Sequence, residues 1–198
     1  MNEIEAFFLE IDRLWEAPRL ERIPFRVIGS GALFLQTPYR RTTKDGDVLE
    51  TLHMTAELKK KLAVLAGKQT DLHKRTGLYL DIVVGGLPLL PHGPLFHPQK
   101  KLNASLHHFS IEALDVTDVV VSKLKRFNQN DANDVLAMIN LDLIEHTKLI
   151  QRFNAAVDRL SMDSRIEDLP TFIANLHRVE RDMLRVPLST IDAPDWMG

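Results

Sequence analysis

Three aspartates in the first half of the chain have the residue type and the spacing that metal-assisted phosphate chemistry requires. Asp45 and Asp47 are two residues apart in a segment with strand character, and Asp81 lies inside the apolar run of a later segment. Side chains two residues apart on a strand point to the same face. If the two segments form neighbouring strands, Asp81 joins the other two carboxylates, and their mutual repulsion favours a divalent cation between them.

Magnesium suits such a group because it prefers oxygen ligands and takes part of its coordination from water and substrate phosphates. A pair of these ions can stabilise both the attacking and the leaving oxygen in phosphoryl-type transfer, so the residues predict a two-metal site. For Asp45-Gly46-Asp47 alone, the structural alternative is a polar turn before a strand. That alternative is weaker for Asp81, since an aspartate within an apolar strand is costly to bury without a partner.

The turn Gly29-Ser30-Gly31 follows a short apolar run and precedes an apolar helical segment. Backbone N–H groups at such a turn can bind an anion, so the turn predicts a phosphate site. The structural alternative is a strand-to-helix turn that uses the conformational freedom of glycine and a serine N-cap. The turn completes neither the dinucleotide-binding fingerprint nor a Walker loop.

Lys123 falls near the middle of the apolar stripe of the helix expected over residues 116–127. A lysine in that place either extends to the edge of the stripe or meets a phosphate or a carboxylate. Asp131 and Asp134 follow at the start of the next helix, where a capping aspartate and an acid in the first turn are the structural interpretation. The functional interpretation is that one of them orients Lys123 or a catalytic water.

The elements that must position these residues follow from apolar periodicity and from the turn residues. We expect strands over residues 25–28, 42–51, 78–84 and 104–110, a proline-rich loop over 88–98, and helices over 4–15, 32–36, 54–66, 116–127, from 131, 143–160 and 169–184. This order predicts an α+β protein with a mixed sheet flanked by helices and an all-helical C-terminal region. We expect a core domain of residues 1–140 and a helical region of residues 141–198.

Composition excludes several classes of protein. The 198 residues are 44% hydrophobic and carry a formal charge of −2, so an RNA partner would need a local patch such as the lysines at 59–61 or Arg40 and Arg41. The chain has no cysteine, which excludes disulfides and thiolate zinc sites and fits a cytoplasmic location. No apolar run approaches the roughly 18 residues of a membrane span, and we expect no membrane partner.

The blocks occur in an order that resembles the nucleotidyltransferase superfamily of DNA polymerase beta. A Gly-Ser pair opens a helix, a basic R-x-T-x-D-x-D segment follows as RTTKDGD, and a third aspartate lies on a later strand. The block DVVVSKLKRFNQNDANDV is similar to that of abortive-infection toxins of the AbiEii and MenT type and of related bacterial nucleotidyltransferase-like proteins. The resemblance covers roughly residues 20–140.

The resemblance implies a nucleotidyltransferase-like core that transfers a nucleoside monophosphate from a nucleoside triphosphate to an acceptor hydroxyl. It implies that Gly29 and Ser30 hold the triphosphate and that Asp45 and Asp47 bind magnesium. Asp81 corresponds to the third carboxylate, which in this superfamily helps to activate the attacking hydroxyl.

In the same resemblance, Lys123 would contact phosphate, and Asp131 or Asp134 would match the last motif.

Two residues depart from the pattern. Gly46 replaces the usual apolar residue between the aspartates, which is expected to loosen the strand, and Gly31 is expected to make the turn more flexible. Neither departure removes a residue that the resemblance assigns to magnesium or to the triphosphate.

The first functional hypothesis is therefore a magnesium-dependent nucleotidyltransferase acting on an RNA 3′ end, such as that of a tRNA, or on a protein, as a component of a toxin–antitoxin pair. The alternative is a catalytically weak or inactive binding module, antitoxin-like, that docks a cognate partner. The near-neutral charge and the amphipathic helices after Leu143 motivate this alternative. In a third interpretation, the aspartates and glycines only shape the edge of a sheet.

Overall fold

The computed structural model describes residues 1–16, 21–84, 87, 89–160 and 164–191, and the chain forms two compact units. Unit 1 consists of Met1–Gly86 and Phe96–Leu114, and unit 2 of Leu87–Leu95 and Asp115–Gly198. The predicted boundary after residue 140 separates a functional core from a helical region. The division into compact units does not test it, so it stays a prediction.

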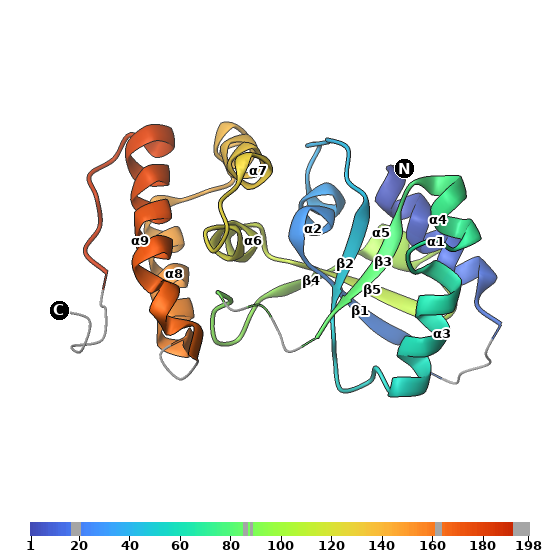
Figure 1. Cartoon of the computed structure of the whole chain (residues 1–198). Helices are drawn as coiled ribbons and strands as arrows, with labels where there is room; N and C mark the ends of the chain where they lie inside the picture. The colour runs from blue at the N-terminus through green and yellow to red at the C-terminus, as the bar shows by residue number, and fades with distance from the viewer. Residues whose placement is uncertain (17–20, 85–86, 88, 161–163, 192–198) are drawn as a thin grey trace. The chain divides into compact units, whose positions relative to one another are not determined.

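Unit 1 is a mixed sheet with helices packed against it (Figure 1). Its elements are α1 (Glu3–Leu14), β1 (Ile23–Val27), α2 (Gly29–Gln36), β2 (Asp45–Leu49), α3 (Ala56–Ala66), α4 (Asp71–Thr76), β3 (Tyr79–Val83), β4 (Phe96–Pro98), α5 (Lys100–Asn103) and β5 (Phe109–Leu114). The strand order is β3-β2-β1-β5-β4, with β2–β3 and β1–β5 parallel and the other two pairs antiparallel. The predicted α+β class is confirmed, and the architecture is consistent with a nucleotidyltransferase-like fold.

Aromatic side chains join the helices to one face of this sheet. Phe25 of β1 lies between Phe8 of α1 and Phe109 of β5, with ring centroids 6.1 and 4.4 Å away. Gly46 of β2 faces the same helices, and a Cβ there would lie 3.3 Å from Cε1 of Phe7. The glycine between the two aspartates therefore has a packing role, because it lets α1 approach β2 closely.

Helix α1 is fixed at its far end by a buried carboxylate. Asp12 is 4% exposed and accepts hydrogen bonds from the backbone N–H groups of His107, His108 and Phe109, at 2.9, 2.7 and 3.1 Å. These groups lead into β5, so one side chain both places α1 on the sheet and fixes where β5 begins. A buried carboxylate is tolerable here because backbone donors satisfy it.

The regular elements in the described part of unit 2 are all helical, as predicted for the C-terminal region. It contains α6 (Val116–Lys123), α7 (Gln129–Asn140), α8 (His146–Leu160), the 3₁₀ turn η1 (Ser164–Asp168), α9 (Leu169–Arg178) and the π-helical turn η2 (Val179–Leu184). Asp118 of α6 is fully buried and binds Arg152 of α8 through two contacts of 2.6 and 2.7 Å. Leu95 donates its backbone N–H to the same carboxylate at 3.0 Å, which joins the segment 87–95 to these helices.

The π-helical turn carries a second buried acid. Glu180 is 0% exposed and lies 2.8 Å from Nε2 of His146 on α8, and the backbone N–H of Ser189 donates to it at 3.1 Å. Burial raises the pKa of Glu180, but the hydrogen bonds from Ser189 and His146 outweigh burial, so this pKa lies below its ordinary value. The carboxylate thus binds the segment after α9 to α8.

Across the described residues, no helix has the length and apolar character to cross a membrane.

Several predicted elements were misplaced between residues 88 and 114. The strand expected at 104–110 is β5, Phe109–Leu114, and the stretch called a loop contains the short strand β4. His107 and His108, expected on a strand, precede it, because their N–H groups bond to Asp12 and not to a neighbouring strand. Helices α4 and α5 were not predicted. For β5 the deciding contact lies far away in the sequence, at Asp12, whereas α4 is capped locally by Thr70 and Gly77.

Replacing Asp12 by alanine should destabilise unit 1 by about 3 kcal/mol, because three backbone N–H groups, of which that of Phe109 is buried, lose their acceptor. Asp12→Asn keeps one acceptor oxygen, so it should lower the free energy of unfolding by less than Asp12→Ala. The exposed Asp71 is the control, and Asp71→Ala should change the unfolding free energy by less than about 0.5 kcal/mol. Urea unfolding measures all three. Equal losses for the Asp12 and Asp71 variants would show that the carboxylate does not anchor α1.

Candidate functional site

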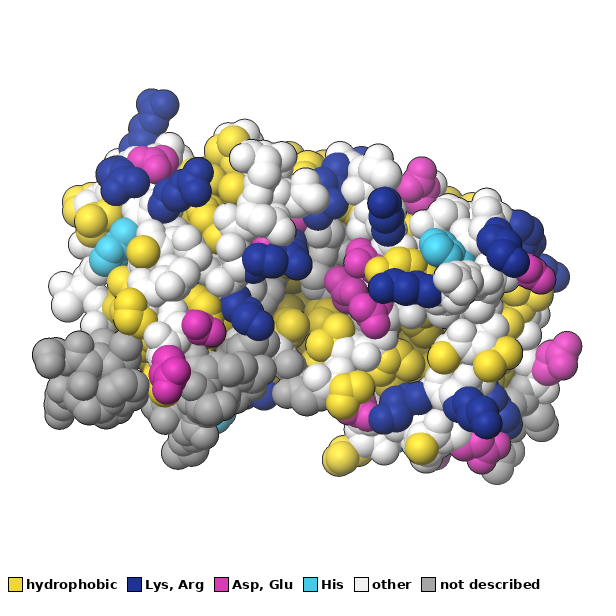
Figure 2. All heavy atoms as spheres, viewed as in Figure 1, with side chains coloured by type: hydrophobic (Ala, Val, Ile, Leu, Met, Phe, Trp, Pro, Cys, Tyr) yellow, Lys and Arg dark blue, Asp and Glu magenta, His cyan; other side chains and the backbone are white. Residues whose placement is uncertain are grey.

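The predicted aspartates come together on two neighbouring strands of unit 1. β2 and β3 are parallel, and their register places Asp47 directly beside Asp81 and Asp45 beside Tyr79. Because Gly46 faces α1, the side chains of Asp45 and Asp47 point to the opposite face of the sheet. Acidic side chains gather over these two strands in the space-filling view (Figure 2). The expectation that the two strands are neighbours is confirmed.

The three carboxylates have different surroundings. Thr43 donates its hydroxyl to Oδ1 of Asp45 at 3.0 Å, and the hydroxyl of Tyr79 lies 3.5 Å from Oδ2. Asp45 is thus oriented by its neighbours, whereas Asp81 is exposed and Asp47 is half-buried. Asp81 is the carboxylate that a large acceptor could most readily reach.

Gly29 lies against the carboxylate of Asp47. It begins α2 with a φ of +61°, and a Cβ on it would lie 2.7 Å from Oδ2 of Asp47. The backbone N–H of the preceding Ile28 donates to the carbonyl of Asp47 at 2.9 Å. Two independent constraints therefore require glycine here: a left-handed backbone and the absence of space for a side chain.

The start of α2 also has the features of an anion site. Its N-cap is Ile28, which makes no side-chain capping bond, so Ser30 is not the N-cap that the structural alternative expected. The hydroxyl of Ser30 is instead the acceptor of a 2.5 Å hydrogen bond from Nη2 of Arg41. A hydroxyl, a guanidinium and the first N–H groups of α2 can together bind phosphate oxygens.

Arg41 was not among the predicted site residues. The sequence suggests it only as part of a basic patch, although it is the arginine of the R-x-T-x-D-x-D segment. Its position in that segment was the signal that could have identified it. Gly31, expected to loosen the turn, instead lies within α2, where its Cβ would be 3.3 Å from Cγ1 of Val27.

The side chains on β2 and β3 fit magnesium in donor type. In the part of the chain that the structure describes, no three His, Cys, Asp or Glu side chains are arranged to hold a metal ion by themselves. Magnesium commonly uses one or two carboxylates and takes its other ligands from water and substrate phosphates. Asp47 and Asp81, in register on adjacent strands, are such a pair of hard oxygen donors.

The other three predicted residues form a buried network in unit 2. Nζ of Lys123 lies 2.7 Å from Oδ2 of Asp134 and 3.2 Å from Oδ1 of Asp131. Arg126 donates to Asp131 as well, at 3.0 Å. Lys123 therefore meets carboxylates of its own unit, which was one of the alternatives for this lysine. The two groups of site residues belong to different units.

Asp131 has a structural role in α7 that the sequence only partly indicated. The N-cap is Asn128, and Asp131 is the third residue of a reciprocal capping box, so Asp131 is not itself the cap. Burial raises the pKa of Asp131, but the hydrogen bond from Arg126 and the charge of Lys123 outweigh it, so the pKa lies below its ordinary value of 3.8. Asp131 remains ionised at neutral pH.

The mixed sheet, with carboxylates on adjacent strands beside a Gly-Ser helix start, is consistent with a nucleotidyltransferase-like fold. A family model described as a nucleotidyltransferase of unknown function (DUF6036) matches residues 6–184. The chain belongs to this family. Comparisons with curated proteins and with solved structures give no significant match.

Gly29→Ala should destabilise the protein by at least about 1 kcal/mol more than Gly77→Ala. Both glycines have positive φ, +61° and +74°, so both variants incur the backbone cost of a left-handed alanine. Only at Gly29 does the new Cβ meet a neighbour, Asp47, since nothing lies within 4 Å of a Cβ at Gly77. Denaturant unfolding compares the two. Equal losses would mean that Asp47 moves aside at no cost.

Stability should also depend on pH through Asp131. Because its pKa in the folded protein is lowered, its ionisation stabilises the fold above the ordinary pKa of 3.8, and this contribution is lost as the pH falls through the folded pKa. Between about pH 6 and pH 2, Asp131→Asn should therefore lose less stability than the wild type does. The exposed Asp142, changed to Asn, is the control and should follow the wild-type curve. Parallel curves for all three proteins would contradict the expectation.

Proposed function

We propose that the protein is a magnesium-dependent nucleotidyltransferase that moves a nucleoside monophosphate from a nucleoside triphosphate to a hydroxyl of a macromolecular acceptor. The acceptor is an RNA 3′ end, such as that of a tRNA, or a protein. The observation that carries the proposal is the register of Asp47 beside Asp81, next to the start of α2. Membership of a nucleotidyltransferase family supports the reaction class.

The triphosphate would bind at the start of α2. The backbone of Gly29 lies against the carboxylate of Asp47, and the hydroxyl of Ser30 and the guanidinium of Arg41 already lie together. A phosphate there would separate Ser30 from Arg41, and both side chains would then bind the phosphate oxygens. The helix N-terminus adds its N–H groups and the positive end of its dipole.

Asp45, Asp47 and Asp81 are the residues that would hold magnesium. When bound, magnesium would neutralise charge on the phosphates and stabilise the attacking and leaving oxygens. The hydrogen bond from Thr43 keeps Asp45 oriented. The chain's own contribution is thus a set of carboxylates already turned to one face of the sheet.

In the proposed reaction, the acceptor oxygen forms a bond to the α-phosphorus. The bond from that phosphorus to the bridging oxygen breaks, pyrophosphate leaves, and Asp81 accepts the hydroxyl proton. The exposure of Asp81 supports its assignment as the base, since a macromolecular acceptor must reach it. Lys123, Asp131 and Asp134 enter the proposal through the resemblance, with Lys123 on phosphate and one of the aspartates in the last motif.

One observation favours the second candidate, a catalytically weak binding module of antitoxin type. Nζ of Lys123 lies within 3.2 Å of two carboxylates, so a phosphate would have to compete with both for this lysine. In either candidate we propose a place in a toxin–antitoxin pair of the AbiEii/MenT kind with a cognate partner, on the strength of the block around Lys123.

The test is label transfer from each of the four radiolabelled nucleoside triphosphates, with magnesium, into total RNA and total protein. Wild-type protein should label one pool, and Asp45→Asn/Asp47→Asn should lower that labelling by at least about a hundredfold, as removal of metal ligands does. Chelation of magnesium should abolish it. Asp71→Asn, which removes an exposed acid outside the site, is the control and should keep full activity.

Thermal denaturation with magnesium and nucleotide separates the candidates. A ligand-dependent rise in Tm without label in either pool would favour the binding module, since a ligand of the folded state raises apparent stability. If no nucleotide gave either label transfer or a rise in Tm, both candidates would be refuted.

A further inference from the structure

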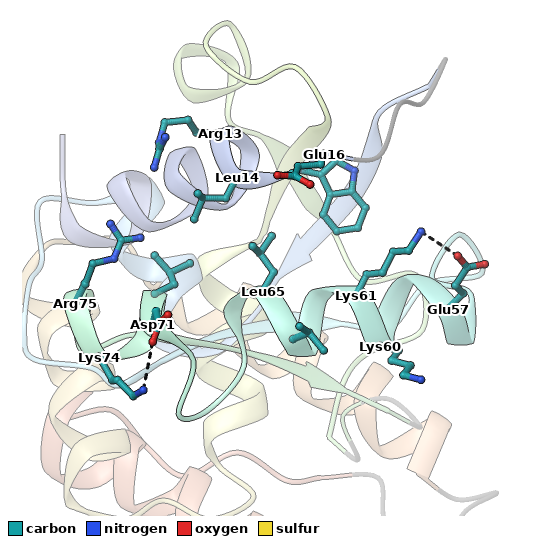
Figure 3. A pocket seen from close by; sticks show the side chains of 13 residues that line it. Arg13, Leu14, Glu16, Glu57, Lys60, Lys61, Leu65, Asp71, Lys74 and Arg75 are labelled. Atoms are coloured by element: carbon teal, nitrogen blue, oxygen red, sulfur yellow. Dashed lines mark hydrogen bonds and ion pairs between the residues drawn. The ribbon is translucent and has the colours of Figure 1, made fainter.

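Unit 1 has a long groove between three helices that the proposed reaction does not use. The C-terminal end of α1, the outer side of α3 and helix α4 enclose it, and its volume is about 1540 Å³ (Figure 3). Sites for small molecules are usually about 300–1,000 Å³, so this groove suits a longer ligand. Helix α1 packs on the face of β2 that carries Gly46, whereas Asp45 and Asp47 point to the other face. A molecule in the groove would leave the carboxylates accessible.

The groove has apolar side chains along its length. Leu14 of α1 and Leu65 of α3 point toward one another across it, and both are half-buried (Figure 3). Val64 of α3 also lines the groove and is 74% exposed, an unusually open position for a large aliphatic side chain. A chain with several apolar anchors could cover these residues.

Positive charge is in excess at both ends of the groove. At one end Arg13 and Arg75 both bind a single acid, Glu10, at 2.8 and 3.1 Å. The hydrogen bond from Arg13 is the largest influence on Glu10 and, with Arg75, lowers its pKa to about 2. One carboxylate between two guanidinium groups leaves one positive charge in excess. At the other end Lys61 pairs with Glu57 at 2.9 Å, and Lys60 adds a further positive charge.

We propose that this groove binds an amphipathic helix of a partner protein, with its apolar face on Leu14, Val64 and Leu65 and an acidic side chain at Arg13 and Arg75. An apolar floor with a charged rim is the pattern by which proteins bind helices in grooves. The excess positive charge favours an acidic partner, since complementary charge sets orientation and specificity. Nucleic acid fits less well, because Lys61 and Lys74 are paired with acids and the floor is apolar.

This docking site is independent of the proposed reaction, because it uses the helical layer of unit 1 and no residue of the carboxylate face. It can therefore stand if the protein proves to have no transferase activity, and it can fail while the enzyme is active.

The test uses two fluorescently labelled helical peptides with the same leucine face, one with glutamate and one with lysine at the polar positions. Fluorescence anisotropy with the full-length protein measures their affinities. The acidic peptide should bind more tightly than the basic one. Val64→Ser should weaken both peptides about tenfold, because an exposed aliphatic side chain is no longer buried on binding. Arg75→Gln should weaken only the acidic peptide, by about fivefold.

Two substitutions outside the groove are matched controls. Val84→Ser changes another exposed valine, 65% exposed, and Arg181→Gln removes the arginine of another exposed ion pair. Neither should alter peptide binding, and circular dichroism verifies that all four variants fold. Equal affinity for both peptides, or binding that survives Val64→Ser, overturns the proposal.

Two further outcomes would also overturn it. If the protein self-associates in sedimentation and Val64→Ser makes it monomeric, the groove is covered by a second copy of the chain. If a single-stranded RNA displaces the acidic peptide and Arg75→Gln weakens that RNA, the site is a nucleic-acid surface.

Discussion

The parallel register of β2 and β3 sets two carboxylates side by side, and much of unit 1 follows from that constraint. Like charges in register on neighbouring strands repel, so Asp47 and Asp81 cannot lie in a dry core. They lie on the more polar face, where Asp81 is exposed and Asp47 half-buried. Strand alternation then forces residue 46 onto the helix face. Only a glycine there allows Phe7 to pack as closely as it does.

The same constraint explains the turn before α2. The carboxylate of Asp47 occupies the space that a side chain at position 29 would need, and the backbone of that residue is left-handed. The turn therefore brings N–H groups and Ser30 near an acid, an arrangement that gains stability when cations and anions bind together. In the proposed reaction, magnesium and the triphosphate would be those ions.

Unit 2 deals with its buried acids in a different way. Asp118 has Arg152, Asp131 has Lys123 and Arg126, and each pair is made within the unit. Buried charges are tolerated only with partners, and loss of one partner costs more than the pair contributes. The first pair connects α6 to the more distant α8, and the others connect α6 and the turn after it to the next helix, α7. Lys123 and Asp131, to which the resemblance gives functional roles, therefore also have a structural role in unit 2.

The groove of unit 1 adds a second surface on the helical layer. Its features come from three helices separated in the chain, and the two arginines at its end meet only through Glu10. A catalytic face on one side of the sheet and a docking groove in the helical layer would let a partner bind without blocking substrate.

The sequence by itself determined the α+β class, the helices with regular apolar spacing, and the facing of Asp45 and Asp47, because periodicity is a local property of the chain. It also indicated Asp81, since an acid in an apolar strand is locally anomalous. It did not determine the start of β5, the role of Arg41 or the groove. The first depends on Asp12, about a hundred residues earlier, and the second on a contact between Arg41 and Ser30. The start of β5 and the groove exist only when distant segments meet, so tertiary structure alone decided them. For Arg41 the sequence segment was a signal, and the structure supplied its partner, Ser30.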